Sequence, residues 1–116
     1  LDMKMDAVDW FAQSIKLKPP AETSWNLGKL YLDLERGPAA KAALWRAREL
    51  ANDEETRTGK TIPWLTEALH ALGQVCMDTR DENCARVAWE QYVERKPAPG
   101  AKLDAVRRAL ATELRR

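Results

Sequence analysis

Cysteine and histidine are the residue types in this chain most suited to chemistry, and both are scarce. The chain has 2 cysteines and 1 histidine. A structural zinc site needs four ligands and a catalytic one usually three, so these residues make a poor metal site. The carboxylates are dispersed along expected helix surfaces instead of grouping around a nucleophile. We therefore expect no metal, no cofactor and no enzymatic activity.

A short run with the order of a phosphate-binding loop lies near the middle of the chain. Gly59, Lys60 and Thr61 match the end of that motif. The motif also requires a glycine at the position of Glu54, and a strand before the loop. We therefore do not expect a nucleotide site here.

The two cysteines flank an expected turn. Cys76 and Cys84 lie at similar distances on either side of Arg80. If the flanking helices pack together, the two sulfur atoms come within bonding distance. Two reduced, buried thiols fit the same spacing, because cysteine also serves as a small apolar residue. A disulfide would indicate an exported or periplasmic protein, whereas reduced thiols leave the cytoplasm as the default.

Charge and hydropathy exclude two classes of partner. The 19 basic and 18 acidic residues leave a formal net charge of +1, which provides no general field for nucleic acid. No apolar run approaches the roughly 20 residues that span a bilayer, so we expect no membrane insertion. The chain begins at Leu1 without a leader pattern. We expect that a signal was removed or that the chain is part of a longer protein.

Composition favours helices. The chain of 116 residues is the length of one domain, and it holds 18 Ala and 14 Leu against 5 Val and 2 Ile. Alanine and leucine favour helix, whereas strands are enriched in β-branched residues. The sequence therefore predicts a single all-α domain.

Helical periodicity and punctuation predict about six helices. Gly37 suits a left-handed cap after the second helix, and Pro38 suits the first turn of the third. The polar stretch 52–62 breaks the pattern, either as a loop or as an extension of the third helix. The predicted helices cover residues 7–17, from 22 to the turn at 36–38, 38–51, 63–77, 82–95 and 101–115.

An internal repeat is the most specific pattern. Six positions of one segment recur 45 residues later with the same offsets: Leu27, Gly28, Tyr31, Ala40, Leu44 and Ala47 correspond to Leu72, Gly73, Cys76, Ala85, Trp89 and Tyr92. The first helix repeats the back half of the pattern at Ala7, Phe11, Ser14 and Pro19.

This pattern resembles the tetratricopeptide repeat (TPR), a 34-residue helix-turn-helix unit. The resemblance covers nearly the whole chain. It implies antiparallel helix pairs stacked in a right-handed superhelix, with small residues where helices nearly touch: Gly28 opposite Ala40, and Gly73 opposite Ala85. Its units would be a partial repeat at 1–18, a repeat at 21–51, an insertion at 52–62, a repeat at 63–97 and a capping helix at 101–116.

The resemblance also implies a binding face. In this family the first helix of each repeat lines a concave groove for a peptide or a partner helix. The matching positions are Trp25, Asn26, Lys29, Leu32, Asp33, His70, Gln74, Met77 and Asp78. Trp25 and Met77 would be the apolar anchors, although packing against neighbouring helices is the alternative for both.

The sequence thus predicts a non-catalytic module that binds a protein or peptide partner. The alternative is a structural segment that caps a longer array whose groove lies upstream. The N-terminal helix lacks its partner helix, so it offers a surface through which copies of the chain would associate.

Overall fold

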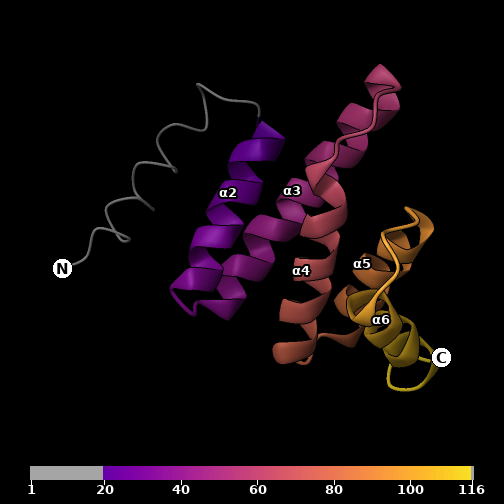
Figure 1. Cartoon of the computed structure of the whole chain (residues 1–116). Coiled ribbons are helices and arrows are strands. Elements are labelled where there is room, and N and C mark those ends of the chain that lie inside the picture. Colours follow the sequence, from indigo (N-terminus) through magenta and orange to yellow (C-terminus); the bar gives the residue numbers. More distant parts are fainter. Residues whose placement is uncertain (1–19, 116) are drawn as a thin grey trace.

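The computed structural model describes residues 20–115, and all of its regular structure in that range is α-helical. The helices are α2 (Pro20–Asp33), α3 (Gly37–Thr58), α4 (Trp64–Asp78), α5 (Glu82–Glu94) and α6 (Ala101–Ala111). They follow one another across the molecule in chain order, and each packs against the next (Figure 1). The prediction of an all-α domain is confirmed. The predicted helix 7–17 and the partial repeat 1–18 lie outside the described residues.

Two helix hairpins, α2–α3 and α4–α5, have the same turn. In the first, the Arg36 N–H donates to the Tyr31 carbonyl oxygen at 2.9 Å; in the second, the Asp81 N–H donates to the Cys76 carbonyl oxygen at 2.8 Å. Both bonds span five residues, as in the Schellman motif that ends many helices. The two turns lie 45 residues apart, at the offset of the sequence repeat.

The residue that turns the chain is not glycine in either hairpin. Glu35 has φ 55° and Arg80 has φ 59°, both in the left-handed region. The expectation that Gly37 forms the left-handed cap is wrong, because Gly37 is already the first residue of α3. Pro38 lies in the first turn of α3 as predicted, where its missing N–H removes no helical hydrogen bond.

Glycines allow the two helices of each hairpin to approach closely. A Cβ added to Gly28 would overlap the Leu44 side chain, and one added to Gly73 would overlap the Trp89 indole. The contact therefore has the same sequence offset in both hairpins. Each glycine acts as the socket for one large residue of the following helix.

Ala40 and Ala85, the small residues expected opposite these glycines, belong to the buried core. Ala40 and Ala85 are fully buried, but the nearest side chains to the two glycines are Leu44 and Trp89. The predicted pairings Gly28–Ala40 and Gly73–Ala85 stay predictions, because the closest contacts described for the glycines are those with Leu44 and Trp89. Leu44 and Trp89 each fill space between the two helices of their own hairpin.

The stretch 52–62 mostly extends α3. Residues 52–58 continue the helix, and Gly59 ends it in a left-handed conformation with φ 71°. The Gly59 N–H donates to the Glu55 carbonyl oxygen at 2.9 Å, which caps the C-terminus. The long end of α3 projects beyond the neighbouring helices before the chain returns to α4 (Figure 1).

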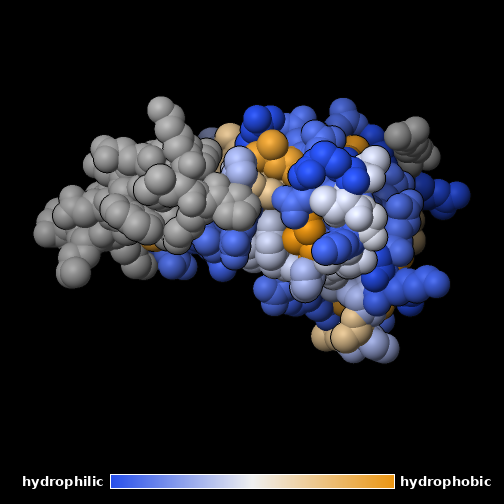
Figure 2. Space-filling view, turned by 90° about the horizontal axis from the view of Figure 1, so that it is seen from above, coloured by the Kyte–Doolittle hydropathy of each residue, from blue (hydrophilic) through white to orange (hydrophobic). Residues whose placement is uncertain are grey.

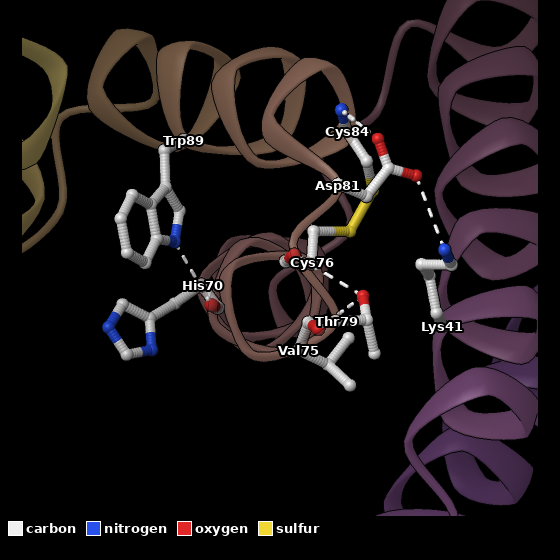
Figure 3. Close-up of a disulfide and its surroundings, with 8 residues drawn as sticks. All are labelled: Lys41, His70, Val75, Cys76, Thr79, Asp81, Cys84 and Trp89. Carbon is white, nitrogen blue, oxygen red and sulfur yellow. Dashed lines mark hydrogen bonds and ion pairs between the residues drawn. A yellow bond between two sulfur atoms is a disulfide. The ribbon is translucent and has the colours of Figure 1, made fainter. Parts of the chain in front are cut away.

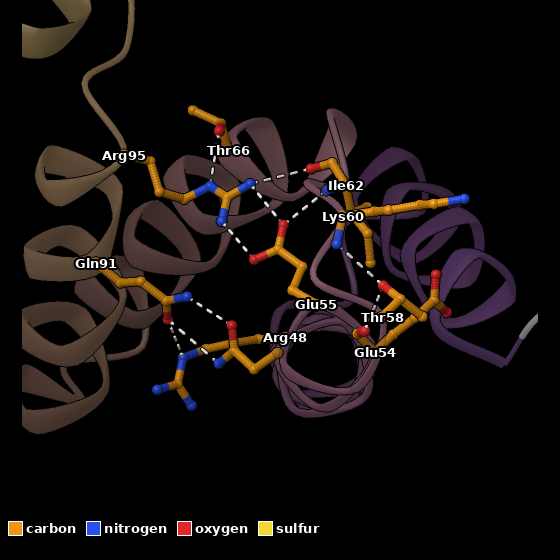
Figure 4. A network of polar contacts seen from close by, with 10 residues as sticks. Arg48, Glu54, Glu55, Thr58, Lys60, Ile62, Thr66, Gln91 and Arg95 are labelled. Carbon is orange, nitrogen blue, oxygen red and sulfur yellow. Dashed lines mark hydrogen bonds and ion pairs between the residues drawn. The ribbon is translucent and has the colours of Figure 1, made fainter.

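A partly buried ion pair ties this extension to α5 (Figure 4). The Arg95 guanidinium contacts both carboxylate oxygens of Glu55 at 2.9 Å and also donates to the Ile62 carbonyl oxygen and to Thr66 Oγ1. The Ile62 N–H donates to Glu55 at 2.7 Å. Bidentate pairs of this kind fix geometry. The connection 59–63 is thus held against both hairpins.

Helix α6 packs on α5 and is shorter than the predicted 101–116. It ends at Ala111, and the Leu114 N–H donates back to the Ala109 carbonyl oxygen at 2.9 Å. Leu103 and Val106 of α6 are buried, and so is Leu114 in the turn that follows the helix.

Candidate functional site

The nine predicted groove residues lie on α2 and α4 with unequal exposure. The exposed members are Lys29, Leu32, Asp33, Gln74 and Asp78, the half-buried ones are Asn26, His70 and Met77, and Trp25 is buried. Among the large hydrophobic residues of the described range, Leu32 is the one that is exposed, with 37% of its surface accessible. Polar residues dominate the described part of the face seen from above, and hydrophobic ones form small separate patches (Figure 2).

Trp25 belongs to the core. Only 7% of its surface is exposed, and its ring stacks on Trp64 at the start of α4, with centroids 6.1 Å apart and an interplanar angle of 7°. Lys29 Nζ lies 4.7 Å from the centroid of the Trp25 ring. Of the two alternatives for Trp25, the structure therefore has packing against a neighbouring helix. The sequence offered no sign of the pairing, because Trp64 lies in the other hairpin.

The α4 members of the set divide into two groups. Gln74 Nε2 donates to Asp78 Oδ1 at 3.2 Å, one turn along the exposed side of the helix. Met77 packs against the edge of the core, which agrees with the packing alternative for this residue. Gln74 and Asp78 remain available to a partner.

His70 lies in a cleft beside two aromatic rings of α5. Its ring centroid is 6.2 Å from Trp89 and 5.4 Å from Tyr92. The cleft, of about 310 Å³, is lined on one side by the segment 97–102 before and at the start of α6. Burial, followed by the positive charge of Lys102, lowers the pKa of His70. The imidazole is therefore neutral at pH 7 and can donate or accept a hydrogen bond.

The backbone of His70 has a structural role. Its carbonyl oxygen accepts a hydrogen bond from Trp89 Nε1 at 3.1 Å (Figure 3). This bond satisfies the indole N–H in a largely apolar contact. It also fixes the tryptophan ring in the socket made by Gly73.

Cys76 and Cys84 form a disulfide in the structure (Figure 3). Their Cα atoms are 5.7 Å apart, within the usual range, and both residues are buried. The Asp81 side chain between them accepts the Cys84 N–H at 3.2 Å and pairs with Lys41 of α3 at 3.2 Å. These interactions, the Cys84 N–H first, lower the pKa of Asp81. Of the two alternatives, the structure therefore has the bridge.

A larger hollow than the His70 cleft lies between α3 and α5. It measures about 550 Å³, and Ala42, Trp45 and Val87 supply its apolar lining. One feature of the sequence indicates this hollow. Trp45 directly follows the buried Leu44, so it points away from the core stripe of α3 and needs another environment.

Among residues 20–115 no group of three or more His, Cys, Asp or Glu side chains could hold a metal ion. None of the helices in that range is long and apolar enough to cross a membrane.

By fold, the described part of the chain is a set of packed helix hairpins. Comparison with known protein families and with curated proteins found no match.

Proposed function

We propose that the chain is a non-catalytic TPR-like module that binds a protein or peptide partner through the face shared by α2 and α4. The observation that supports this most is the equivalence of the two hairpins. They have the same turn hydrogen bonds and the same glycine socket at an offset of 45 residues. Equivalent hairpins stacked in sequence form a superhelix whose first helices share one face.

The exposed chemistry of that face suits a protein segment. Leu32 supplies an apolar contact beside the charged groups of Lys29 and Asp33 on α2. Gln74 and Asp78 continue the polar part on α4. Mixed apolar and polar surfaces of this kind are typical of protein interfaces. In the family that the sequence resembles, such a face belongs to a right-handed superhelix.

A second candidate is a structural cap for a longer array. Helix α6 supports it, because Leu103 and Val106 are buried while Lys102, Arg107 and Arg108 are exposed. A polar outer face is what the last element of a helical array requires. The disulfide supports an oxidising compartment for either candidate.

A quantitative pull-down distinguishes the two candidates. The wild-type chain, a Lys29→Glu/Leu32→Arg variant and an Arg108→Ala control would be exposed to an extract of the source cells, and captured proteins would be compared by mass spectrometry. A binding module should lose its partners in the first variant and keep them in the control. Equal capture by all three proteins would contradict the α2–α4 face.

A further inference from the structure

A groove runs between α3 and α5, on helices that the proposed binding face does not use. Its first part is the hollow of about 550 Å³ beside Trp45. Its second part, of about 390 Å³, is lined by Arg48, Asn52 and Gln91. Val87 lines both parts, and the Arg48 guanidinium lies 4.6 Å from the centroid of the Trp45 ring, so the two hollows adjoin.

The first part is apolar and its flanking charges are already compensated. Trp45 and Val87 are half-buried and Ala42 is exposed at the rim. Lys41 pairs with Asp81 at 3.2 Å, as seen where α3 faces the disulfide in Figure 3. A charged ligand gains little at such a rim, whereas an apolar group removes the surfaces of Trp45 and Val87 from water.

The second part has an excess of negative charge. Glu90 and Glu94 line it from α5, one helical turn apart, against the single guanidinium of Arg48. That guanidinium is already engaged, because Arg48 Nε donates to Gln91 Oε1 at 2.9 Å (Figure 4). This end of the groove therefore favours a cation.

The groove is held in shape by contacts at both ends. Lys41–Asp81 joins α3 to the start of α5, and Glu55–Arg95 joins the far end of α3 to the residue after α5. Between them, Gln91 Nε2 donates to Asn52 Oδ1 at 2.6 Å. A preformed groove spends little of its binding free energy on ordering its own side chains.

From these features we infer that the α3–α5 groove is a second binding site, and that its occupant is a segment of a partner protein with one large apolar side chain and one basic side chain. Along α3 the lining extends from Trp45 in the apolar part to Asn52 in the polar part, which is seven residues, or about 10 Å, along the helix. That distance corresponds to about seven residues of a helical partner or about three of an extended one.

The test uses random linear peptides displayed on phage and selected on the intact, oxidised chain. Selected peptides should share a large apolar residue and a Lys or Arg at one of the two spacings. Their affinity would be measured by fluorescence anisotropy on four variants. Ala42→Trp fills the hollow and Glu94→Lys reverses the charge of the second part, while Ala105→Trp and Glu67→Lys make the same changes at exposed positions of α6 and α4.

We expect Ala42→Trp and Glu94→Lys each to weaken binding at least about tenfold, and the two controls to leave it unchanged. Circular dichroism would verify that the variants are folded. Glu94→Lys lies on the surface at the C-terminus of α5, where a cation is favoured, so it keeps the test valid if Ala42→Trp is unstable.

Three outcomes would overturn the inference. The first is that no peptide is enriched, and the second is that enriched peptides lack a basic residue or respond to Glu67→Lys rather than Glu94→Lys. The third is that an uncharged dye such as N-phenylnaphthylamine binds to the chain, that Ala42→Trp weakens its binding, and that no peptide binds. This result would assign the hollow to a small apolar ligand. The α2–α4 face is untouched by the two groove variants, so its own test is independent.

Discussion

The two hairpins reach the same turn by different chemical means. In α4–α5 the helices are joined by the Cys76–Cys84 disulfide, and Asp81 caps the second helix. In α2–α3 the positions equivalent to the cysteines are Tyr31 and Ala39, and Arg36 makes no side-chain cap hydrogen bond. The shared backbone therefore does not depend on the disulfide or on the cap. It depends on the glycine socket and on buried apolar residues, which both hairpins have.

The hairpins also differ in the residue that fills the socket. Leu44 is flexible, whereas the Trp89 indole is rigid and hydrogen-bonded to the His70 carbonyl oxygen. The second hairpin should therefore tolerate change less well than the first. Four measurements can break or sharpen this comparison.

The largest difference should follow from adding one methyl group to each glycine. Gly73→Ala would drive a Cβ into the Trp89 ring and should lower the free energy of unfolding by about 3 kcal/mol. Gly28→Ala meets the end of the Leu44 side chain, which can move, and should cost about 1 kcal/mol. Urea denaturation of both variants measures the two losses. Equal losses would contradict the proposed difference between a rigid and a flexible socket.

Removing the disulfide should have the next largest effect. In the chain-entropy description, a bridge between residues 8 apart stabilises by about 2.5 kcal/mol. The Cys76→Ala/Cys84→Ala double variant should therefore melt at a lower temperature but keep its helical circular dichroism. The equivalent pair, Tyr31→Cys/Ala39→Cys, should oxidise to a second bridge, detected by mass spectrometry as the loss of two hydrogens. Failure of that pair to oxidise would show that the two turns are less alike than their hydrogen bonds indicate.

The contact between the hairpins should be sensitive to pH. The hydrogen bond from Arg95 is the main cause that lowers the pKa of Glu55. A carboxylate whose pKa is lower in the folded state stabilises the fold above its ordinary pKa near 4.5, and this contribution is lost as the pH falls through the folded-state value. Glu55→Gln should cost about 2 kcal/mol at pH 7.

The control for that prediction is Glu49→Gln, an exposed position on the same helix. Thermal unfolding of the three proteins between pH 7 and the acid range measures the effect. The Glu55→Gln variant should approach the wild type as the pH falls, while the control should follow the wild type throughout. A constant difference at every pH would show that Glu55 acts by packing alone.

The smallest effect should come from exchanging the caps. Asp81→Ala removes the acceptor of the Cys84 N–H and should cost about 1 kcal/mol. Arg36→Asp places a capping carboxylate at the equivalent position of α3 and should stabilise by less, because Pro38 has already removed one N–H that would need an acceptor. The urea unfolding midpoints of the two variants measure the loss and the gain. A gain from Arg36→Asp that exceeds the loss from Asp81→Ala would contradict the expected order.

Local patterns in the sequence were enough for the elements and for part of the site. Helical periodicity predicted the helices of the described range to within a few residues, apart from the end of α3. Cys76 and Cys84 lie on either side of the turn that joins two paired helices. Residues that flank such a turn are close in space whatever the rest of the chain does, so their spacing was enough to predict that they lie within reach of each other. The repeat offset identified Gly28 and Gly73 as places of close approach.

Local patterns did not predict which of the groove residues are exposed. The prediction that the groove residues bind a partner remains to be tested. Their positions on α2 and α4 followed from periodicity. The burial of Trp25 did not, because it depends on Trp64 in the other hairpin.

Apart from the end of α3, the sequence by itself determined which residues form helices and which helices pair, because both depend on interactions between near neighbours in the chain. Only the tertiary structure decided that residues 52–58 extend α3, that Glu55 pairs with Arg95 40 residues away, and that Trp45 lines a hollow. Each depends on how one hairpin lies on the other. Periodicity within a helix gives the direction of a side chain, but not the distance to a partner on another element.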